Sequence, residues 1–312
     1  MTADRYVRSA RRWALGAELV YGPIAADLAA MSPHQLAGRT VLDAGAGTGA
    51  ASAALRARNA RVLAMDRSAD MLAWNAAARP PCAVADIRAL PLAAGSVDDS
   101  IAAFVLNHLT DPGAGLAELS HVTRPGGAIL AAVFSTGSRS QARDRIDALA
   151  LAAGWQVPGW YAELKATAVP VLGSDTAMAA AAHAAGLDAV YAEERPVDVG
   201  VTDPAQLVRY RLGQAPFADW LDAIGVTAAE KFAAATAEAI GDDMQPYQPI
   251  VVFLPASSPA DRPPRASSPA ATTQSLTASG QIGWPPHMRN FFGRHVCIAG
   301  SGFGALIPRW GR

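Results

Sequence analysis

Short apolar runs alternate with amphipathic stretches in the first half of the chain, between residues 40 and 134. Apolar runs of roughly four to eight residues indicate buried strands, and apolar positions spaced by three or four residues indicate helices. This alternation predicts βαβ units, in which crossover helices join parallel strands of a sheet buried on both faces. The predicted strands cover 40–44, 61–66, 82–85, 100–106 and 128–134, and the predicted helices cover 50–57, 69–78 and 116–122.

The second half of the chain has a more helical pattern. Asp203 is placed to cap a helix, and Pro204 is placed in its first turn. An aromatic-rich stretch, 155–173, lacks a clear period and predicts a loop. The predicted helices cover 138–153, 175–186, 203–224 and 227–240, and the predicted strands cover 189–199 and 249–254.

The two ends of the chain differ from this central part. Residues 1–39 predict N-terminal helices, with a basic amphipathic stretch at 4–19 that favours a solvated helix packed on the domain over a membrane-surface helix. Residues 256–281 are rich in Ser, Pro, Ala and Thr and predict disorder. The last part, 282–312, contains a glycine-rich run but ends before the helix and acidic residue of a nucleotide site, which predicts a non-native tail.

We therefore expect a cover at 1–39, one main domain at 40–255 and a tail at 256–312. Long apolar runs are absent from the sequence, so no transmembrane helix is expected. The net charge of −1 gives no electrostatic reason to expect nucleic acid as a partner. Two cysteines make neither a disulfide framework nor a metal set, which fits a cytoplasmic protein without a bound metal. Cys82 follows an apolar pattern and is expected in the core.

A glycine-rich turn carries the first candidate chemistry. Asp43-Ala-Gly-Ala-Gly-Thr-Gly follows the first strand and opens the first helix, where free backbone N–H groups can contact a ligand. Gly45, Gly47 and Ala50 also satisfy the dinucleotide-binding pattern. Asp66 ends the second strand and suits the hydroxyls of a ribose in either interpretation.

Three further features favour a cofactor other than a dinucleotide. Asp43 precedes the first glycine by two residues, where a carboxylate can face a cationic ligand. Asp86 follows the third strand and can accept a hydrogen bond from an adenine amino group. Asn107 and His108 end the fourth strand, at the carboxyl edge where open α/β sheets bind ligands.

In their order along the chain, these motifs resemble those of class I S-adenosylmethionine-dependent methyltransferases, especially the ubiquinone/menaquinone-biosynthesis-like type. The resemblance spans about 41–134 and rests on Val41–Gly49, Met65-Asp66, Ala85–Pro91, Ser96–Asp98, Asn107-His108 and Arg124–Gly127. It implies a Rossmann-like, doubly wound α/β fold. The sheet would have seven mostly parallel strands, with the antiparallel last strand inside it.

The resemblance also implies S-adenosylmethionine as the cofactor. The glycine turn would line its methionine end, Asp66 would bind the ribose, and Asp86 would bind the adenine amino group. Met65 and Ile87 would sandwich the adenine, although both also suit an ordinary core. The implied cofactor-binding residues are Tyr21, Asp43, Ala44, Gly45, Gly47, Met65, Asp66, Asp86, Ile87 and Asn107.

Methyl transfer is an in-line displacement that depends mainly on positioning. A base is needed where the acceptor must lose a proton, and His108 is the candidate catalytic base. The helical insert at 203–241 carries Tyr210, Phe217 and Trp220, which predicts either a lid over a small apolar or aromatic acceptor or a packed helical subdomain. The pattern does not distinguish a monomer from a homodimer.

Two other functions stay open at this point. The first is a nicotinamide-dependent oxidoreductase on a similar sheet, against which Asp43 argues. The second is a methyltransferase-like protein that binds the cofactor or a partner without transferring a methyl group.

Overall fold

The computed structural model describes residues 4–260 and contains one seven-stranded sheet in the order β3-β2-β1-β4-β5-β7-β6. Only β7 runs antiparallel to its neighbours, and it lies between β5 and β6. This confirms the predicted fold, including the antiparallel last strand inside the sheet. The strands are β1 (Thr40–Ala44), β2 (Arg61–Asp66), β3 (Cys82–Val84), β4 (Asp99–Ala103), β5 (Ala128–Phe134), β6 (Glu193–Pro196) and β7 (Ile250–Ser257).

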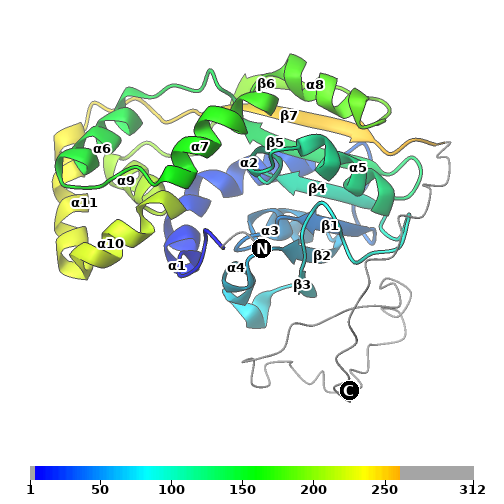
Figure 1. Ribbon diagram of the computed structural model, residues 1–312, viewed down its shortest axis with the longest axis horizontal. Coiled ribbons are helices and arrows are strands. Elements are labelled where there is room, and N and C mark those ends of the chain that lie inside the picture. Colours follow the sequence, from blue (N-terminus) through cyan, green and yellow to red (C-terminus); the bar gives the residue numbers. More distant parts are fainter. Residues whose placement is uncertain (1–3, 261–312) are drawn as a thin grey trace.

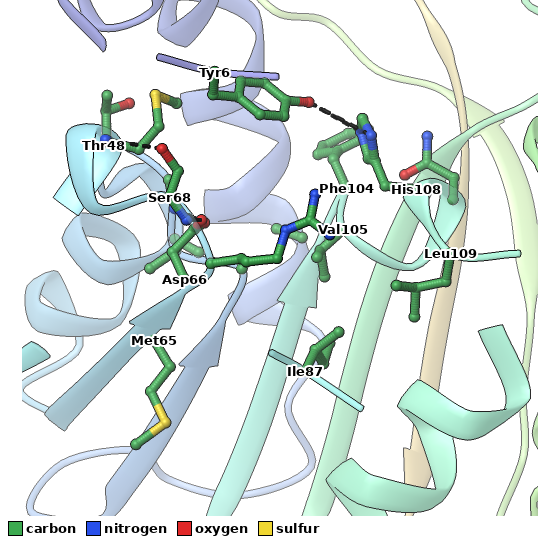
Figure 2. A pocket seen from close by; sticks show the side chains of 18 of the residues that line it. Tyr6, Thr48, Met65, Asp66, Ser68, Ile87, Phe104, Val105, His108 and Leu109 are labelled. Atoms are coloured by element: carbon green, nitrogen blue, oxygen red, sulfur yellow. Dashed lines mark hydrogen bonds between the residues drawn. The ribbon is translucent and has the colours of Figure 1, made fainter. Parts of the chain in front are cut away.

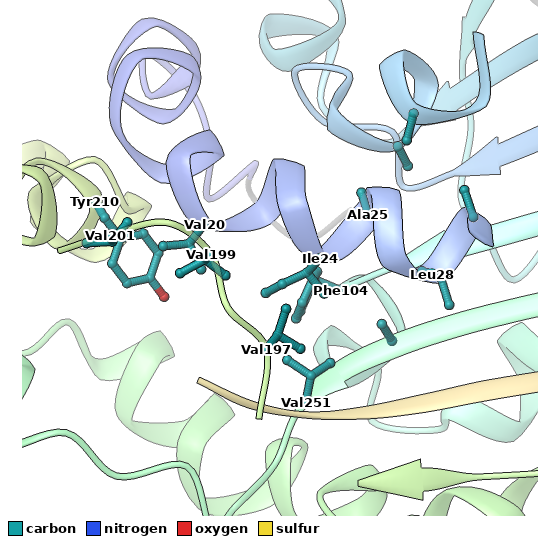
Figure 3. Close-up of a cluster of buried hydrophobic side chains, with 14 of the residues drawn as sticks. Val20, Ile24, Ala25, Leu28, Phe104, Val197, Val199, Val201, Tyr210 and Val251 are labelled. Atoms are coloured by element: carbon teal, nitrogen blue, oxygen red, sulfur yellow. The ribbon is translucent and has the colours of Figure 1, made fainter. Parts of the chain in front are cut away.

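Helices cover both faces of the sheet (Figure 1). One face packs on α2 (Glu18–Ala30) and α3 (Ala50–Ala57), and the other packs on α5 (Pro112–Val122) and α8 (Asp175–Ala184). The strands are therefore apolar on both sides, which explains their continuous apolar runs. On the α2 face, Figure 3 shows Ile24 and Leu28 directed toward the sheet among buried valines.

A helical group lies to the left of the sheet, at the end where β7 begins (Figure 1). Tyr210 and Phe217 from this group are almost completely buried, with exposed fractions of 1% and 0%. Both residues belong to the same hydrophobic cluster as α2 and the sheet, so the predicted insert at 203–241 packs into the common core. The helices of the whole group are α6 (Gln141–Ala152), α7 (Gly159–Thr167), α9 (Pro204–Leu212), α10 (Ala218–Ile224) and α11 (Val226–Ile240), of which only the last three belong to the insert.

The N-terminal helices pack closely against this group. A short helix, α1 (Ala10–Arg12), continues through one π-helical stretch (Trp13–Ala17) into α2. Gly213, at the end of α9, contacts the π-helical backbone so closely that an added Cβ would come within 2.8 Å of the Arg12 carbonyl oxygen. The glycine therefore allows the two backbones to approach.

Some predicted boundaries were wrong. The helix predicted at 69–78 ends as α4 (Ala69–Ala73), because Asn75 adopts a left-handed conformation with φ of +50°. The strand predicted at 100–106 ends at Ala103, because Phe104 has φ of +60°. The predicted loop at 155–173 instead contains α7 and a 3₁₀ turn (Val169–Leu172). Residues 203–224 are split into α9 and α10 after Leu212.

Two other expectations need correction or fall outside the structure. Cys82 is exposed on β3 at the sheet edge and is not a core residue. Strand β7 continues to Ser257, two residues beyond the predicted domain end at 255. The rest of the predicted tail, 261–312, lies outside the described residues. Among the helices between residues 4 and 260, none is long and apolar enough to cross a membrane.

Candidate functional site

A cavity of about 310 Å³ lies at the carboxyl ends of β1, β2, β4 and β5. The strand order reverses here, because β1 is followed by β2 on one side and by β4 on the other. Ligands of open α/β sheets bind at this kind of switch point. Figure 2 shows Asp66, Val105 and His108 around the cavity, with Tyr6 above it from the N-terminal segment.

The glycine turn after β1 forms one wall of the cavity. Gly45 has φ of +75°, and a Cβ added there would lie 2.5 Å from the Val105 side chain. Gly47 has φ of +51°, but its nearest neighbour would be the end of Met71, at 3.6 Å. Gly45 is therefore required both by backbone conformation and by contact with the β4 side of the site, whereas Gly47 is required mainly by conformation.

Asp66 connects this turn to the end of β2. One carboxylate oxygen accepts from the Gly47 amide at 2.8 Å, and the other accepts from the Ser68 amide at 2.7 Å. Burial raises the pKa of Asp66, while these two hydrogen bonds act in the opposite direction. Because each carboxylate oxygen can accept more than one hydrogen bond, Asp66 retains capacity for the hydroxyls of a ligand.

Asp43 lies behind the turn rather than in the cavity lining. Its side chain is only 1% exposed, and one oxygen accepts from the Ser52 hydroxyl at 2.6 Å. The other oxygen, Oδ1, is buried and has no hydrogen-bond partner among the described residues. Burial raises the pKa of Asp43 to about 6, although the Ser52 hydroxyl opposes the shift. A buried acceptor without a partner among the described residues has the capacity to accept a hydrogen bond from a ligand.

The residues that the sequence predicts to bind adenine have different surroundings in the structure. Asp86 and Ile87 both line the cavity, but the Asp86 carboxylate is paired with Arg88 at 2.6 Å. This pairing lowers the pKa of Asp86 and keeps it ionised. The Met65 side chain is buried in the same apolar cluster as Ile87 and, in Figure 2, points away from Asp66. The adenine sandwich therefore stays a prediction.

Asn107 and His108 follow β4 on a 3₁₀ turn (Leu106–His108) and both line the cavity. The Asn107 side-chain oxygen is buried without a described hydrogen-bond partner. The Tyr6 hydroxyl lies 3.3 Å from Nε2 of His108 (Figure 2). Burial, followed by the nearby charges of Arg5 and Arg67, lowers the pKa of His108 to about 4. His108 is therefore neutral at pH 7 and has one nitrogen available as an acceptor.

Five aromatic residues form a continuous surface on the β4–β5 side, which we call the aromatic wall. Neighbouring rings in the wall lie between 4.6 and 5.6 Å apart, centroid to centroid. The wall carries no formal charge and therefore suits a flat, apolar ligand. Its members, all of which line the cavity, are Tyr6, Trp13, Tyr21, Phe104 and Phe134.

Sequence reasoning missed several of these residues. Phe134 ends β5 and Phe104 directly follows β4, at the edge where a ligand was expected, so the carboxyl-edge rule would have found both. Tyr6 and Trp13 had no signal beyond their position in a predicted cover. Tyr21 was expected over the cofactor, and the structure places it beside Phe104 and Phe134. Its contact with the cofactor stays a prediction.

The helical insert and metal-binding groups are absent from the site as described. Among the residues 4–260 that line the cavity, none comes from 203–241. The same part of the chain contains no cluster of three or more His, Cys, Asp or Glu residues that could hold a metal. The cover over the cavity is formed by Asp4, Arg5 and Tyr6, and by Trp13 at the start of the π-helical stretch. Asp4 accepts a hydrogen bond from the hydroxyl of Ser68, the N-cap of α4, at 2.7 Å, which connects this cover to the segment that follows β2.

Comparison with known proteins identifies what this arrangement is similar to. Residues 42–131 match the family described as a methyltransferase domain. A demethylmenaquinone methyltransferase of Mycolicibacterium paratuberculosis is 37% identical over 137 residues, which are 44% of this chain and 52% of that protein. A malonyl-(acyl-carrier protein) O-methyltransferase of Serratia marcescens is 38% identical over 109 residues, which are 34% of this chain and 43% of that protein. The chain spans about half the length of the curated relatives it matches.

Solved structures agree on the fold. Phosphoethanolamine N-methyltransferase 2 of Haemonchus contortus, in complex with phosphomonomethylethanolamine and S-adenosylhomocysteine, is 16% identical with a TM-score of 0.50 and covers 76% of this chain and 52% of its own. A proposed methyltransferase from an antibiotic biosynthesis pathway of Anabaena variabilis is 17% identical with a TM-score of 0.52 and covers 74% of this chain and 95% of its own. At these identities the likeness concerns the fold alone.

Proposed function

We propose that this chain, which carries a class I methyltransferase domain, binds S-adenosylmethionine and transfers its methyl group to a small-molecule acceptor. The observation that carries the proposal is the convergence of the glycine turn, Asp66 and Asn107 on one cavity at the switch point of the sheet. The relatives named for methyl transfer to a quinone precursor or to a carrier-bound acid support this class of reaction. Their acceptors differ, so they do not choose one for this chain.

The residues present fit the cofactor. The glycine turn leaves room for a close approach, and Oδ1 of Asp43 and Oδ1 of Asn107 are buried acceptors without described partners. Asp43 would favour the positive end of the cofactor from behind the turn, and Asp66 would hold the ribose hydroxyls. Ile87 and Asp86 would bind the adenine, with Arg88 sharing the Asp86 carboxylate. Ala44 would contribute through the backbone that leads into the turn.

S-adenosylmethionine supplies a methyl group on a sulfonium, which is activated without help from the protein. The chain's own contribution is to hold the acceptor in line and to exclude water. The aromatic wall orients a flat acceptor, and the N-terminal segment from Asp4 covers the cavity. Where the acceptor loses a proton, neutral His108 accepts it, directly or through the Tyr6 hydroxyl at 3.3 Å.

The insert at 203–241 does not line the cavity. It would therefore act as a lid only indirectly, by packing behind the aromatic wall. We further propose a cytoplasmic location, supported by the two widely spaced cysteines. We also propose that a small molecule is the partner in the reaction. A nicotinamide-dependent oxidoreductase is the alternative that the same turn and Asp66 would allow.

Isothermal titration with S-adenosylmethionine, with NADH as the control ligand, tests the cofactor. We expect micromolar binding of S-adenosylmethionine alone. Binding of NADH alone would replace this proposal with the oxidoreductase. Release of S-adenosylhomocysteine during an acceptor screen then separates an enzyme from a protein that only binds the cofactor.

A further inference from the structure

A chain of buried polar side chains runs from the helical group to the aromatic wall, and we call it the Asp147–Tyr21 chain. The Arg211 guanidinium binds the Asp147 carboxylate through two hydrogen bonds of 2.7 Å and also donates to the Gln214 side-chain oxygen. The Gln214 amide nitrogen then donates to the Tyr21 hydroxyl at 3.4 Å. Arg211 is only 4% exposed, so its fork is fixed by this ion pair.

The direction of each hydrogen bond in this chain follows from Arg211. A guanidinium has only donors, so it can bind Gln214 only through the side-chain oxygen. This turns the Gln214 amide nitrogen toward Tyr21, and the Tyr21 oxygen must accept. The Tyr21 O–H proton is therefore not used within the chain, and no other described group accepts it. Burial raises the pKa of Tyr21 far above its ordinary value, so the proton is always present.

Gln214 is held firmly enough to impose this direction. It stands directly before a 3₁₀ turn (Ala215–Phe217) whose Pro216 carbonyl accepts from the Trp155 indole at 3.0 Å. The Trp155 ring also stacks on Phe217 with centroids 4.1 Å apart. The preceding residue, Gly213, contacts the backbone at Arg12 and Ala17 and so brings the turn against the N-terminal helices. Gln214 does not itself line the cavity, but it joins the helical group to Tyr21, which does.

We infer that Tyr21 is a specificity-determining residue, held by the Asp147–Tyr21 chain as a hydrogen-bond donor toward an oxygen atom of the acceptor. The inference rests on the proposed function only in calling this ligand the acceptor. Within the wall, the ring of Tyr21 contacts the rings of Trp13, Phe104 and Phe134. A pure hydrocarbon bound against the wall would displace water and leave the O–H without a partner, which is unfavourable. The favoured class is a flat apolar or aromatic molecule with a carbonyl or similar oxygen.

A pair of matched probes tests this without methyl transfer. 2-Acetylnaphthalene carries a carbonyl, and 2-isopropenylnaphthalene replaces that oxygen with a CH₂ group of similar shape. We expect wild-type protein to bind the ketone about 2- to 10-fold more tightly than the hydrocarbon, as for one net hydrogen bond. Tyr21→Phe should remove this preference and leave hydrocarbon binding unchanged.

Gln214→Glu provides the second, isosteric test. Both carboxylate oxygens can only accept, so the Tyr21 proton would turn toward residue 214 and the preference should again be lost. Tyr21→Phe combined with Gln214→Glu should lose no more of the preference than either single variant, because both substitutions act on one hydrogen bond. Tyr161→Phe is the matched control, since the Tyr161 hydroxyl contacts Arg211 but is not bonded to Tyr21, and it should keep the preference.

The outcomes separate this inference from the proposed function. Equal binding of the two probes by wild-type protein, or a preference that survives Tyr21→Phe, would overturn the inference, as would failure of both probes to bind. If Gln214→Glu keeps the preference for the ketone, the Asp147–Tyr21 chain does not orient the Tyr21 proton. Titration with S-adenosylmethionine in the same preparations tests the function independently, so a preference without cofactor binding would contradict only the proposed function.

Discussion

At the scale of single residues, the lowered pKa of His108 predicts how kcat depends on pH. Its pKa is lowered to about 4, first by burial and then by two arginines, so it stays neutral at pH 6 to 8. We expect kcat to be flat across that range and to fall only as the pH approaches the lowered pKa. His108→Ala should lower kcat more than it weakens cofactor binding. The measurement is the pH profile of kcat together with the dissociation constant from titration.

Exposed His183, on α8, is the control for this experiment, and His183→Ala should change neither quantity. A limb of the kcat profile near pH 6.5 that disappears in His108→Ala would contradict the lowered pKa. An unchanged kcat in His108→Ala, with a natural acceptor, would remove the catalytic role.

The raised pKa of Asp43 leads to a second prediction, in which Asp43→Asn affects stability and cofactor affinity in opposite directions. Burial raises its pKa to about 6, so between about pH 4 and 6 the folded protein holds a proton that the unfolded chain has lost. The free energy of unfolding contributed by this group therefore decreases as the pH rises through that window. Asp43→Asn should remove this dependence and be at least as stable at pH 7.5. It should also bind S-adenosylmethionine about tenfold or more weakly, since a charged acceptor is lost.

Denaturant unfolding at pH 4.5 and 7.5 and titration with the cofactor measure these two effects. Ser52→Ala, which removes the hydroxyl donor to Asp43 but not the carboxylate, is the matched variant and should lower stability at pH 7.5. Wild-type affinity in Asp43→Asn would mean that the carboxylate does not act on the ligand.

The residues of the site were predictable where the chain returns to one sheet edge. Asp66, Ile87, Asn107 and His108 all line the cavity because each ends or follows a strand whose carboxyl end is at that edge. The hydrogen-bond partner of each site residue was not predictable from the sequence, because it depends on contacts between distant segments. Tyr6 with His108 and Gln214 with Tyr21 are joined over 102 and 193 residues.

At the scale of elements, the glycine turn after β1 gives a comparison of two substitutions. Gly45→Ala combines a strained positive φ with a Cβ contact of 2.5 Å to Val105, whereas Gly47→Ala has the strain but an open neighbourhood. We expect Gly47→Ala to lower the free energy of unfolding by about 1–2 kcal/mol, from the left-handed backbone alone. Gly45→Ala should cost about 1–3 kcal/mol more, as for an overpacked core. Chemical denaturation of both variants measures the difference.

Val105→Ala is the variant that tests the reason for this difference. Combined with Gly45→Ala it should recover part of the loss, since it removes Cγ1 and Cγ2 of Val105, at 2.9 and 2.5 Å from the new methyl group, while Cβ at 2.5 Å remains. Combined with Gly47→Ala it should give only additive effects. Equal losses in the two alanine variants would contradict the close contact between β1 and β4.

Elements were predictable where local rules decide them. Asp203 caps α9 and Pro204 occupies its first turn, as the sequence predicted. Local rules failed where tertiary contacts decide. The stretch at 155–173 has no helical period, yet Trp155, Leu164 and Leu172 are buried and stabilise α7 and the turn that follows it. Strand β4 ended early because of Phe104, whose left-handed backbone at the cavity has no sequence signature.

At the scale of the whole molecule, the end of β7 decides where the chain can be shortened. Ala256 and Ser257 pair with Ile129 and Ala128, and Ser258 exchanges two 2.9 Å backbone hydrogen bonds with Gly126 and Gly127. We expect truncation after Ala260 to leave both the melting temperature and the affinity for S-adenosylmethionine unchanged. Truncation after Pro255, the end predicted from composition, removes these pairings and should lower the free energy of unfolding by about 2–4 kcal/mol, at about 1 kcal/mol for each lost hydrogen bond.

Both truncations lack residues 261–312, so their difference isolates the last residues of the sheet. Strand β7 is an internal antiparallel strand, and its end pairs with β5 on one side. Strand β5 also carries Phe134 into the aromatic wall. The shorter protein should therefore bind the cofactor normally at low temperature, where it is folded, and lose binding only as it unfolds. A large loss of affinity on truncation after Ala260 would instead show that the C-terminal residues take part in the site, and the domain would then have to be redefined to include them.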